Sequence, residues 1–384
     1  MVTEREAGLM KDFFWLAVVA AGMVAAQASL LPGEEPESPA TGSYQNPVGG
    51  PDLLMGDPFA LRDDDTYFLF GTNGSDGFRY WTSPDLVHWQ PQGYAFQRSP
   101  GDWGDTTFWA PEVAMYRGQA YLIFSSQPSQ TKAFDARICV AVAETPAGPF
   151  QLLHAPWFET DQACIDGHLF VDDDGTPYLF FSYVGAVGNA HDPDEDGYLF
   201  AKIYGARLKE DLSDLAETPK LCLEADQPWE LTGTSRHPRT RTTEGAFVFR
   251  ENDTYYMTYS SHHYTDPKYG IGYATASSPL GPWTKSADNP LVQAAPEIGV
   301  SGPGHSSITT SPDGSERFLV YHTHANPEAP SGRRTVNIDR LEIDKDGKLR
   351  VLGPTRSLQP LPSGVPETTE SSQTSPSGEG HREE

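Results

Sequence analysis

Cysteine and positive charge are both scarce in this sequence. Three of the 384 residues are cysteine, an odd number that is too small for a disulfide scaffold and leaves at least one thiol unpaired. Lys and Arg number 27 against 53 Asp and Glu, which gives a formal net charge of −26. Because nucleic-acid binding depends on basic patches that displace counterions from phosphates, this charge balance argues against a nucleic-acid partner.

Helical periodicity and several catalytic motifs are also missing. Apolar residues hardly ever recur with the spacing of an amphipathic helix. The sequence has no glycine-rich phosphate loop, no Gly-x-Ser-x-Gly elbow and no Cys-x-x-Cys pair. Nucleotide binding, serine-hydrolase chemistry and a structural zinc site therefore have no motif to support them.

Aromatic residues and turn-forming residues are, by contrast, abundant. Phe, Trp and Tyr make up 11% of the chain, which is far more than a disordered acidic protein contains. The 36 glycines and 33 prolines are spaced between short apolar runs. This spacing is typical of a protein with many turns and many short strands.

The two ends of the chain differ in composition from the middle. An apolar run extends from Phe13 to Ala26 and is followed by the small-residue pattern Ala26-Gln27-Ala28. The run is shorter than the roughly 20 residues of a membrane-spanning helix, which disfavours a membrane anchor and favours a secretory signal peptide. We predict a signal peptide over 1–28, a linker over 29–43 and a disordered tail over 362–384, with a secreted or periplasmic location and no membrane contact after cleavage.

One sequence pattern recurs five times between the two ends. A polar residue opens an apolar segment, a turn rich in Asp, Asn or Gly follows, and an aromatic run then ends in small hydroxyl residues. The five copies cover 56–72, 109–126, 165–182, 243–260 and 304–323. Their aligned aromatic residues, 67, 121, 178, 256 and 318, are spaced 54, 57, 78 and 62 residues apart. Four strands with their turns fill about this length in a blade of a β-propeller.

The repeat predicts an all-β fold, a five-bladed β-propeller over residues 44–361. The second strand of each copy is apolar on both faces, as expected for sheets stacked between neighbouring blades. Insertions near 184–200 and 224–242 lengthen the third unit. A β-sandwich or a two-domain all-β protein is the alternative, but neither would explain five copies of one pattern.

Acidic residues stand at the start of four of the five units, and a histidine stands in the fifth. If the units are equivalent, these side chains converge at one mouth of the central channel; they are Asp57, Glu112, Asp166, Glu244 and His305. Carboxylates gathered there repel one another and lose water, which costs free energy unless a water, cation or substrate lies among them. Such a cluster indicates a functional site more than a structural one.

The motifs around these residues resemble glycoside hydrolase family 43, which contains arabinanases, α-L-arabinofuranosidases and β-xylosidases. The resemblance covers about residues 44–361 and rests on five motifs in order, Asp57-Pro58-Phe59, Trp109-Ala110-Pro111-Glu112, Ile165-Asp166-Gly167-His168-Leu169-Phe170, Thr243-Glu244-Gly245 and Gly302-Pro303-Gly304-His305-Ser306. It implies a five-bladed propeller that hydrolyses glycosidic bonds with inversion of the anomeric centre.

The resemblance implies a role for each of three carboxylates. Asp57 corresponds to the general base that activates water, Glu244 to the general acid, and Asp166 to a third carboxylate that orients Glu244 and raises its pKa. A nearby negative charge does disfavour ionisation of a carboxyl group. Inversion also needs room for a water, so we expect the carboxyl groups of Asp57 and Glu244 to lie about 6.5–9.5 Å apart.

The resemblance also implies substrate contacts and an ion site. His305 corresponds to a channel histidine beside a bound water or metal ion, so we expect no cofactor for the reaction but a structural calcium or other ion in the channel near His305. Arg333 matches a substrate-contacting arginine, although the adjacent Arg334 leaves that choice open. His322 and His324 lie two residues apart and face one side of a strand, and we interpret them as structural.

Aromatic residues near the second unit are candidates for stacking on sugar rings. We predict that Phe108, Trp109 and Glu112 bind substrate, with Trp103 or Phe108 as a wall of the site, because they lie before or within the second innermost strand. Packing between blades is the alternative for a strand tryptophan.

The sequence thus predicts a secreted inverting glycoside hydrolase, acting as a monomer on arabinofuranosyl or xylosyl linkages of plant cell-wall polysaccharides or oligosaccharides. The alternative function is a carbohydrate-binding propeller without catalysis, because a fold does not by itself give an activity. Retention of all three carboxylates favours the enzyme.

Overall fold

The computed structural model describes residues 42–131, 133–188, 197–231 and 239–365. The predicted signal peptide, the predicted linker up to residue 41 and the predicted tail from residue 366 lie outside the described residues. Regular structure in the described chain is β-strand apart from one short 3-10 helix, Pro296–Ile298. None of these residues forms a helix with the length and apolarity that crossing a bilayer requires.

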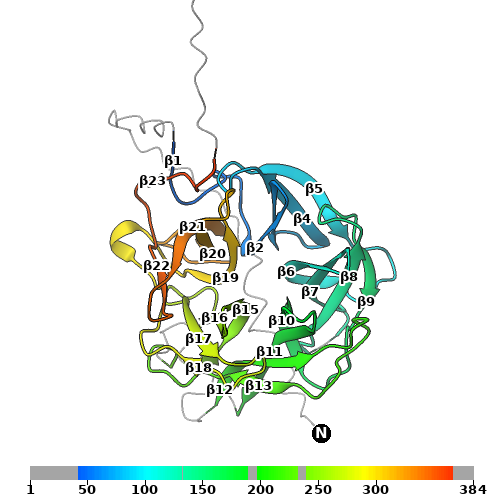
Figure 1. The fold of residues 1–384 in the computed structure, drawn as a ribbon. Helices are drawn as coiled ribbons and strands as arrows, with labels where there is room; N and C mark the ends of the chain where they lie inside the picture. The colour runs from blue at the N-terminus through cyan, green and yellow to red at the C-terminus, as the bar shows by residue number, and fades with distance from the viewer. Residues whose placement is uncertain (1–41, 132, 189–196, 232–238, 366–384) are drawn as a thin grey trace, which may run out of the picture.

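Five antiparallel sheets stand as blades around a central axis (Figure 1), which confirms the predicted five-bladed propeller. In each blade the strands follow one another in chain order, starting at the centre of the ring. The first blade contains β2 (Gly56–Asp63), β3 (Thr66–Thr72), β4 (Gly77–Ser83) and β5 (Gln90–Gln97). The second contains β6 (Thr106–Tyr116), β7 (Gln119–Gln127), β8 (Arg137–Ala143) and β9 (Gln151–His154).

The other three blades have the same plan. The third contains β10 (Ala163–Val171), β11 (Pro177–Val187), β12 (Tyr198–Arg207) and β13 (Lys220–Leu223), and β14 (Thr240–Thr242) adds to it by pairing in parallel with β12. The fourth contains β15 (Glu244–Glu251), β16 (Thr254–Ser261), β17 (Gly270–Ala276) and β18 (Thr284–Lys285). The fifth contains β19 (Gly304–Thr310), β20 (Arg317–His324), β21 (Arg334–Ile343) and β22 (Leu349–Val351).

Apolar side chains fill the space between neighbouring blades. Between the first two blades, the rings of Phe78, Phe96, Phe108 and Phe124 pack with centroids 5.1 to 6.4 Å apart. Burial of each such ring contributes about 1.5–3 kcal/mol to stability. The second strands are therefore covered on both faces, as their apolar sequences predict.

The N-terminal segment ties the first blade to the fifth. β1 (Ser43–Tyr44) pairs with β23 (Gln359–Pro360), and the amides of Val48 and Met55 donate to the carbonyls of Val336 and Arg334 on β21, both at 3.0 Å. No strand is shared between the first and last blades in the described chain, so these bonds join the two ends of the ring.

Each innermost strand has a β-bulge near its start, and β6 has two, one on each side of Trp109. In each blade one bulge residue adopts left-handed backbone at the corresponding place, which in β6 is the second bulge, and these residues are Asp57 (φ 53°), Ala110 (φ 44°), Asp166 (φ 59°), Gly245 (φ 60°) and His305 (φ 48°). This conformation costs a non-glycine residue about 1–2 kcal/mol, so the surrounding structure has to stabilise it.

A hydrogen bond from the neighbouring blade holds four of these bulges. The bulge amide donates to a side chain at the end of the preceding blade's second strand, in the pairs Ala110 to Thr72 (2.8 Å), Asp166 to Ser125 (3.1 Å), His305 to Ser260 (2.7 Å) and Asp57 to His322 Nδ1 (3.1 Å). These hydroxyl residues are the ones that end each aromatic run in the repeat. Each bond contributes about 1 kcal/mol and fixes the register of one blade against the next.

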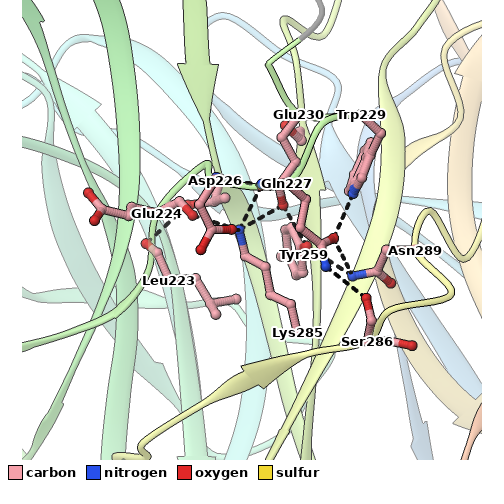
Figure 2. Close-up of polar contacts among 12 residues, drawn as sticks. Leu223, Glu224, Asp226, Gln227, Trp229, Glu230, Tyr259, Lys285, Ser286 and Asn289 are labelled. Carbon is pink, nitrogen blue, oxygen red and sulfur yellow. Dashed lines mark hydrogen bonds and ion pairs between the residues drawn. The ribbon is translucent and has the colours of Figure 1, made fainter.

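The second insertion is anchored by a buried ion pair outside the central channel. The Lys285 ammonium contacts Glu230 at 2.7 and 2.8 Å and Asp226 at 2.8 Å, and Tyr259 donates to Glu230 at 2.6 Å (Figure 2). Glu230 has no exposed surface. Residues 224–231 therefore attach the end of the third blade to the fourth, while 232–238 lie outside the described residues.

We predict that Lys285→Met destabilises the protein by about 3–5 kcal/mol, because it leaves the buried carboxylate of Glu230 without its cation. Urea unfolding monitored by tryptophan fluorescence measures the change. Lys348→Met is the matched control: Lys348 pairs with Asp288 at 2.6 Å on the surface, and its loss should cost less than about 1 kcal/mol. Equal midpoints for the two variants would contradict the proposed anchoring.

Candidate active site

All five blades contribute side chains to one cavity of about 260 Å³. Its lining includes most of the residues that the sequence singled out, namely Asp57, Trp109, Asp166, Glu244 and His305, together with Thr72, Ile165, Val184, Thr242, His262, His263, Tyr264, Tyr269, Gly332 and Arg334. The convergence of the three carboxylates, predicted from the repeat, is therefore found in the structure.

The bulges explain how these side chains reach the cavity. Asp57, Asp166 and His305 are the bulge residues of their blades. Glu244 precedes its bulge residue, Gly245, by one position. The prediction that all units place their polar residue at one equivalent position is thus wrong for Glu244, although its side chain still lines the cavity.

Glu112 does not line the cavity, which corrects its prediction as a substrate-binding residue. It lies two residues beyond the bulge residue Ala110, and its carboxylate is 2.6 Å from Nδ1 of His168. The Val248 amide donates to the other ring nitrogen of His168 at 3.0 Å, so Nδ1 carries the proton and donates to Glu112. Glu112 is a buried partner of His168, and its charge acts on the site only at a distance.

Phe108 is also absent from the cavity wall. It is 2% exposed and packs between the first and second blades, and Trp103 packs against the same cluster. The prediction that either residue forms a substrate wall is wrong, because both side chains face the neighbouring blade. Trp109 lines the cavity and stacks on Phe134 with ring centroids 6.1 Å apart.

Arg334, and not Arg333, belongs to the site. Arg333 is exposed, whereas Arg334 is buried and its Nη1 lies 2.7 Å from Oδ1 of Asp57. A Cβ at position 56 would collide with the Arg334 guanidinium, so Gly56 leaves the space through which this arginine reaches Asp57. The choice between the two arginines is therefore decided by the start of β21: Arg334 is its first residue and faces Asp57, and Arg333 precedes the strand and is exposed.

Asp57 is surrounded by groups that favour its ionised form. Arg334 pairs with Oδ1, Thr72 donates to Oδ2 at 2.6 Å, and the rings of His305 and His322 lie 3.4 and 3.6 Å from Oδ1. Burial alone would raise the pKa of Asp57, but the attraction of Arg334 and the two histidines, with the Thr72 hydrogen bond, holds that pKa well below its usual range. Asp57 is therefore a carboxylate at neutral pH.

The surroundings of Glu244 and Asp166 raise the pKa values of these two carboxyl groups. Burial raises the pKa of Glu244 to about 7, with a further rise from the charge of Asp57, while the Tyr269 hydroxyl at 2.7 Å and Arg334 lower it. Burial and the charges of Glu244, Asp57 and Glu112 raise the pKa of Asp166 well above its ordinary value, against a hydrogen bond from the Gly245 amide. The pair retains a proton near neutral pH.

The site thus holds one ionised carboxylate, Asp57, and a pair of carboxyl groups, Glu244 and Asp166, that together retain a proton near neutral pH. Two titratable groups with pKa values pushed apart are what general acid and base catalysis needs. The ionised group can remove a proton from water while the protonated group gives one to a leaving oxygen.

An ion near His305 would need ligating side chains around it. In the described parts of the chain, no three His, Cys, Asp or Glu side chains lie together as a ligand set for a metal. The His305 ring lies beside Asp57 and lines the cavity. These side chains do not form a metal site by themselves, and the channel ion stays a prediction.

Comparison with known proteins now decides the family. The sequence model of "Glycosyl hydrolases family 43" matches residues 44–349. The chain belongs to glycosyl hydrolase family 43. The predicted family is confirmed, and with it the enzyme class, a glycosidase.

Individual similar proteins agree with this assignment. The chain is 30% identical to xylosidase/arabinosidase 43A of Humicola insolens, over 64% of this chain and 75% of that protein. It is 26% identical to β-D-galactofuranosidase xynD of Aspergillus niger, over 76% of this chain and 81% of that protein. A crystal structure of a thermostable family-43 glycoside hydrolase is 41% identical with a TM-score of 0.76, covering 84% of this chain and all of that chain.

Sequence reasoning missed two residues that contact the carboxylates in this structure, Thr72 and Tyr269. It left Arg334 open as the alternative to Arg333 and interpreted His322 as structural, whereas both lie beside Asp57. Thr72 had a usable signal, because it ends the second strand of its unit. Tyr269 stands in no motif and gave none.

We predict that Arg334→Met raises the pKa of Asp57, since it removes the largest group that lowers it. The acid limb of the kcat/KM profile should then move up toward or beyond about 4, the ordinary range of Asp. Arg333→Met is the control and should leave the profile unchanged, because Arg333 is exposed. A profile measured from pH 3 to 9 that changes in neither variant, or in both, would refute the assignment of Arg334.

Proposed function

We propose that this family-43 glycosidase is a secreted, inverting enzyme that cleaves arabinofuranosyl or xylosyl linkages in plant cell-wall polysaccharides such as arabinan and arabinoxylan. The observation that carries the proposal is the unequal surroundings of two carboxyl groups in one cavity: Asp57 pairs with Arg334 at 2.7 Å, whereas Glu244 has the neutral Tyr269 hydroxyl at 2.7 Å. A non-catalytic binding propeller would gain nothing from this arrangement, because burying three carboxylates together costs free energy.

In the proposed reaction, Asp57 is the general base and Glu244 the general acid. The Asp57 carboxylate takes a proton from water as the water oxygen bonds to the anomeric carbon, on the face opposite the leaving group. Glu244 gives its proton to the glycosidic oxygen as the bond from that oxygen to the anomeric carbon breaks. The products are a sugar of inverted configuration and an alcohol, and proton exchange with solvent then restores both carboxyl groups.

Asp166 is proposed to keep Glu244 protonated between turnovers. The two groups repel each other when both are ionised, and the charge of Glu244 accordingly raises the pKa of Asp166. The Gly245 amide binds the carboxylate of Asp166, which also orients it next to the acid. In this role Asp166 changes the fraction of Glu244 that is protonated and does not contact the glycosidic bond that breaks.

The names of similar proteins support the substrate class. They include a xylosidase/arabinosidase, an arabinoxylan arabinofuranohydrolase of Paenibacillus polymyxa and a structure of an endo-arabinase from Bacteroides thetaiotaomicron. Secretion is supported by the predicted signal peptide and by two relatives described as extracellular, from Streptomyces avermitilis and Cellvibrio japonicus.

The test of the proposed function is a substrate panel of aryl α-L-arabinofuranosides, aryl β-D-xylosides and linear arabinan. We expect Glu244→Gln to lower kcat/KM by about 10²–10⁴ on substrates with poor leaving groups but little on dinitrophenyl glycosides, which leave without protonation. Asp57→Asn should abolish hydrolysis of both kinds of substrate, those with poor leaving groups and the dinitrophenyl glycosides. Early product followed by proton NMR should have the inverted configuration; a retained one, or activity in Asp57→Asn near that of wild type, would overturn the mechanism.

The basic limb of the pH profile gives a separate prediction. The acid is active when protonated, so activity is present below the Glu244 pKa and lost above it. With that pKa at about 7, kcat/KM on a poor leaving group should fall about tenfold per unit at higher pH. Glu244→Gln on a dinitrophenyl glycoside should lack this limb. A wild-type profile that stays flat to pH 9 would refute the assignment of Glu244.

A further inference from the structure

Tyr269 lies in the wall of the cavity, immediately before β17, and is 1% exposed. Its hydroxyl is 2.7 Å from Oε1 of Glu244. Burial and the charges of Glu244 and Asp57 raise the pKa of Tyr269 well above its ordinary value, so the phenol keeps its proton and donates it in this hydrogen bond.

The direction of this bond distinguishes the two oxygens of Glu244. In a protonated carboxyl group, the carbonyl oxygen is the better acceptor and the other oxygen carries the proton. Because Oε1 accepts from Tyr269, the transferable proton resides on Oε2.

The ring of Tyr269 is held in place from the fifth blade. It stacks on the ring of His322 with centroids 5.6 Å apart and planes at 6°. A Cβ at position 304 would collide with the Tyr269 ring, so Gly304 leaves the space that this ring occupies. The tyrosine is thus held at both its hydroxyl and its face.

The same histidine holds the backbone of Asp57. His322 has no exposed surface, and its Nδ1 accepts the Asp57 amide at 3.1 Å, in the position that a hydroxyl takes at three other bulges. Glu244, Tyr269, His322 and Asp57 therefore form one buried series of contacts that connects the two carboxylates through the protein.

We propose that Tyr269 is a positioning residue of the hydrolysis, which selects the oxygen of Glu244 that carries the proton and, through its stack on His322, holds the acid in a constant position relative to the Asp57 backbone. The inference rests on the proposed role of Glu244 as general acid. It assigns a role to a tyrosine that stands outside the five sequence motifs.

The other charged groups near Glu244 remain when the hydroxyl is removed. They are Asp166 on β10, Asp57 on β2 and Arg334 on β21. Of these contributions, the Tyr269 hydrogen bond and Arg334 favour the ionised form of Glu244, and burial and Asp57 oppose it. Tyr269→Phe keeps the ring and its stack but removes one of the two stabilising groups.

The test compares Tyr269→Phe with wild type on a poor leaving group and on a dinitrophenyl glycoside. We expect kcat to fall about 10- to 100-fold on the poor leaving group and little on the dinitrophenyl glycoside, because only the former needs a well-placed proton. The basic limb of kcat/KM should move up by about one pH unit, since the carboxylate loses a donor.

Tyr259→Phe is the matched control. Tyr259 lies in the same blade and donates to a buried glutamate, Glu230, at 2.6 Å, in the ion-pair network away from the cavity. Its loss should lower stability without changing the leaving-group dependence or the basic limb. A loss in Tyr269→Phe that is equal for both leaving groups, or an unmoved basic limb, would reduce Tyr269 to a packing residue.

Two further measurements separate a failure of the Tyr269 proposal from a folding defect and from a failure of the proposed function. If Tyr269→Phe does not fold, 3-fluorotyrosine incorporated at position 269 keeps the ring and strengthens the donor, so the basic limb should move to lower pH; an unmoved limb contradicts the proposal. Failure of the proposed function has a different signature: Glu244→Gln would then lose activity equally on both leaving groups, whatever the Tyr269 variants do.

Discussion

The hydrogen bond between a bulge amide in one blade and a side chain in the preceding blade is the contact on which the site depends. A bulge aims a side chain that a regular strand would direct elsewhere, but it also places its residue in left-handed backbone and removes a ladder partner. In blades one, two, three and five, the neighbouring blade supplies the missing acceptor. Because the preceding blade holds the bulge in these four blades, the positions of Asp57 and Asp166 are a property of the closed ring.

The fourth blade, whose innermost strand begins with Glu244, departs from this rule. The Gly245 amide binds the carboxylate of Asp166, and the hydroxyl oxygen of Ser182, which stands where the other blades have their acceptor, has no hydrogen-bond partner in the described structure. Glycine adopts the left-handed backbone without strain, so this bulge needs less support. The amide is thus available to bind Asp166, and the third and fourth blades are joined through this carboxylate in place of a hydroxyl.

The three carboxylates differ in how many nearby cations and hydrogen-bond donors stabilise their charge. The proposed acid and base catalysis depends on this difference. Asp57 has Arg334 at 2.7 Å and a hydroxyl donor at 2.6 Å. Glu244 has one neutral donor, Tyr269, and Asp166 has backbone amide support with acidic neighbours. A single guanidinium placed beside Asp57 therefore separates the proposed base from the proposed acid, while burial acts on all three in the same direction. The resulting ionised and protonated groups are what hydrolysis of a glycosidic bond needs.

The local pattern of the sequence was sufficient for the five units, their strand order and the three carboxylates, because each unit repeats one alternation of apolar runs and turns that neighbouring blades can bury. It was not sufficient for Phe108 and Glu112, which flank Trp109 where β6 has its two bulges and the alternation of faces is interrupted. It was also not sufficient for the arginine doublet, where a difference of one residue at the start of β21 decides which side chain reaches Asp57. Tyr269 had no local signal at all, since its partners Glu244 and His322 come from different strands and meet it only in the closed ring. Sequence determined which residues each blade presents; the packing of blade on blade decided which of them face the cavity and which of their oxygens and nitrogens carry protons.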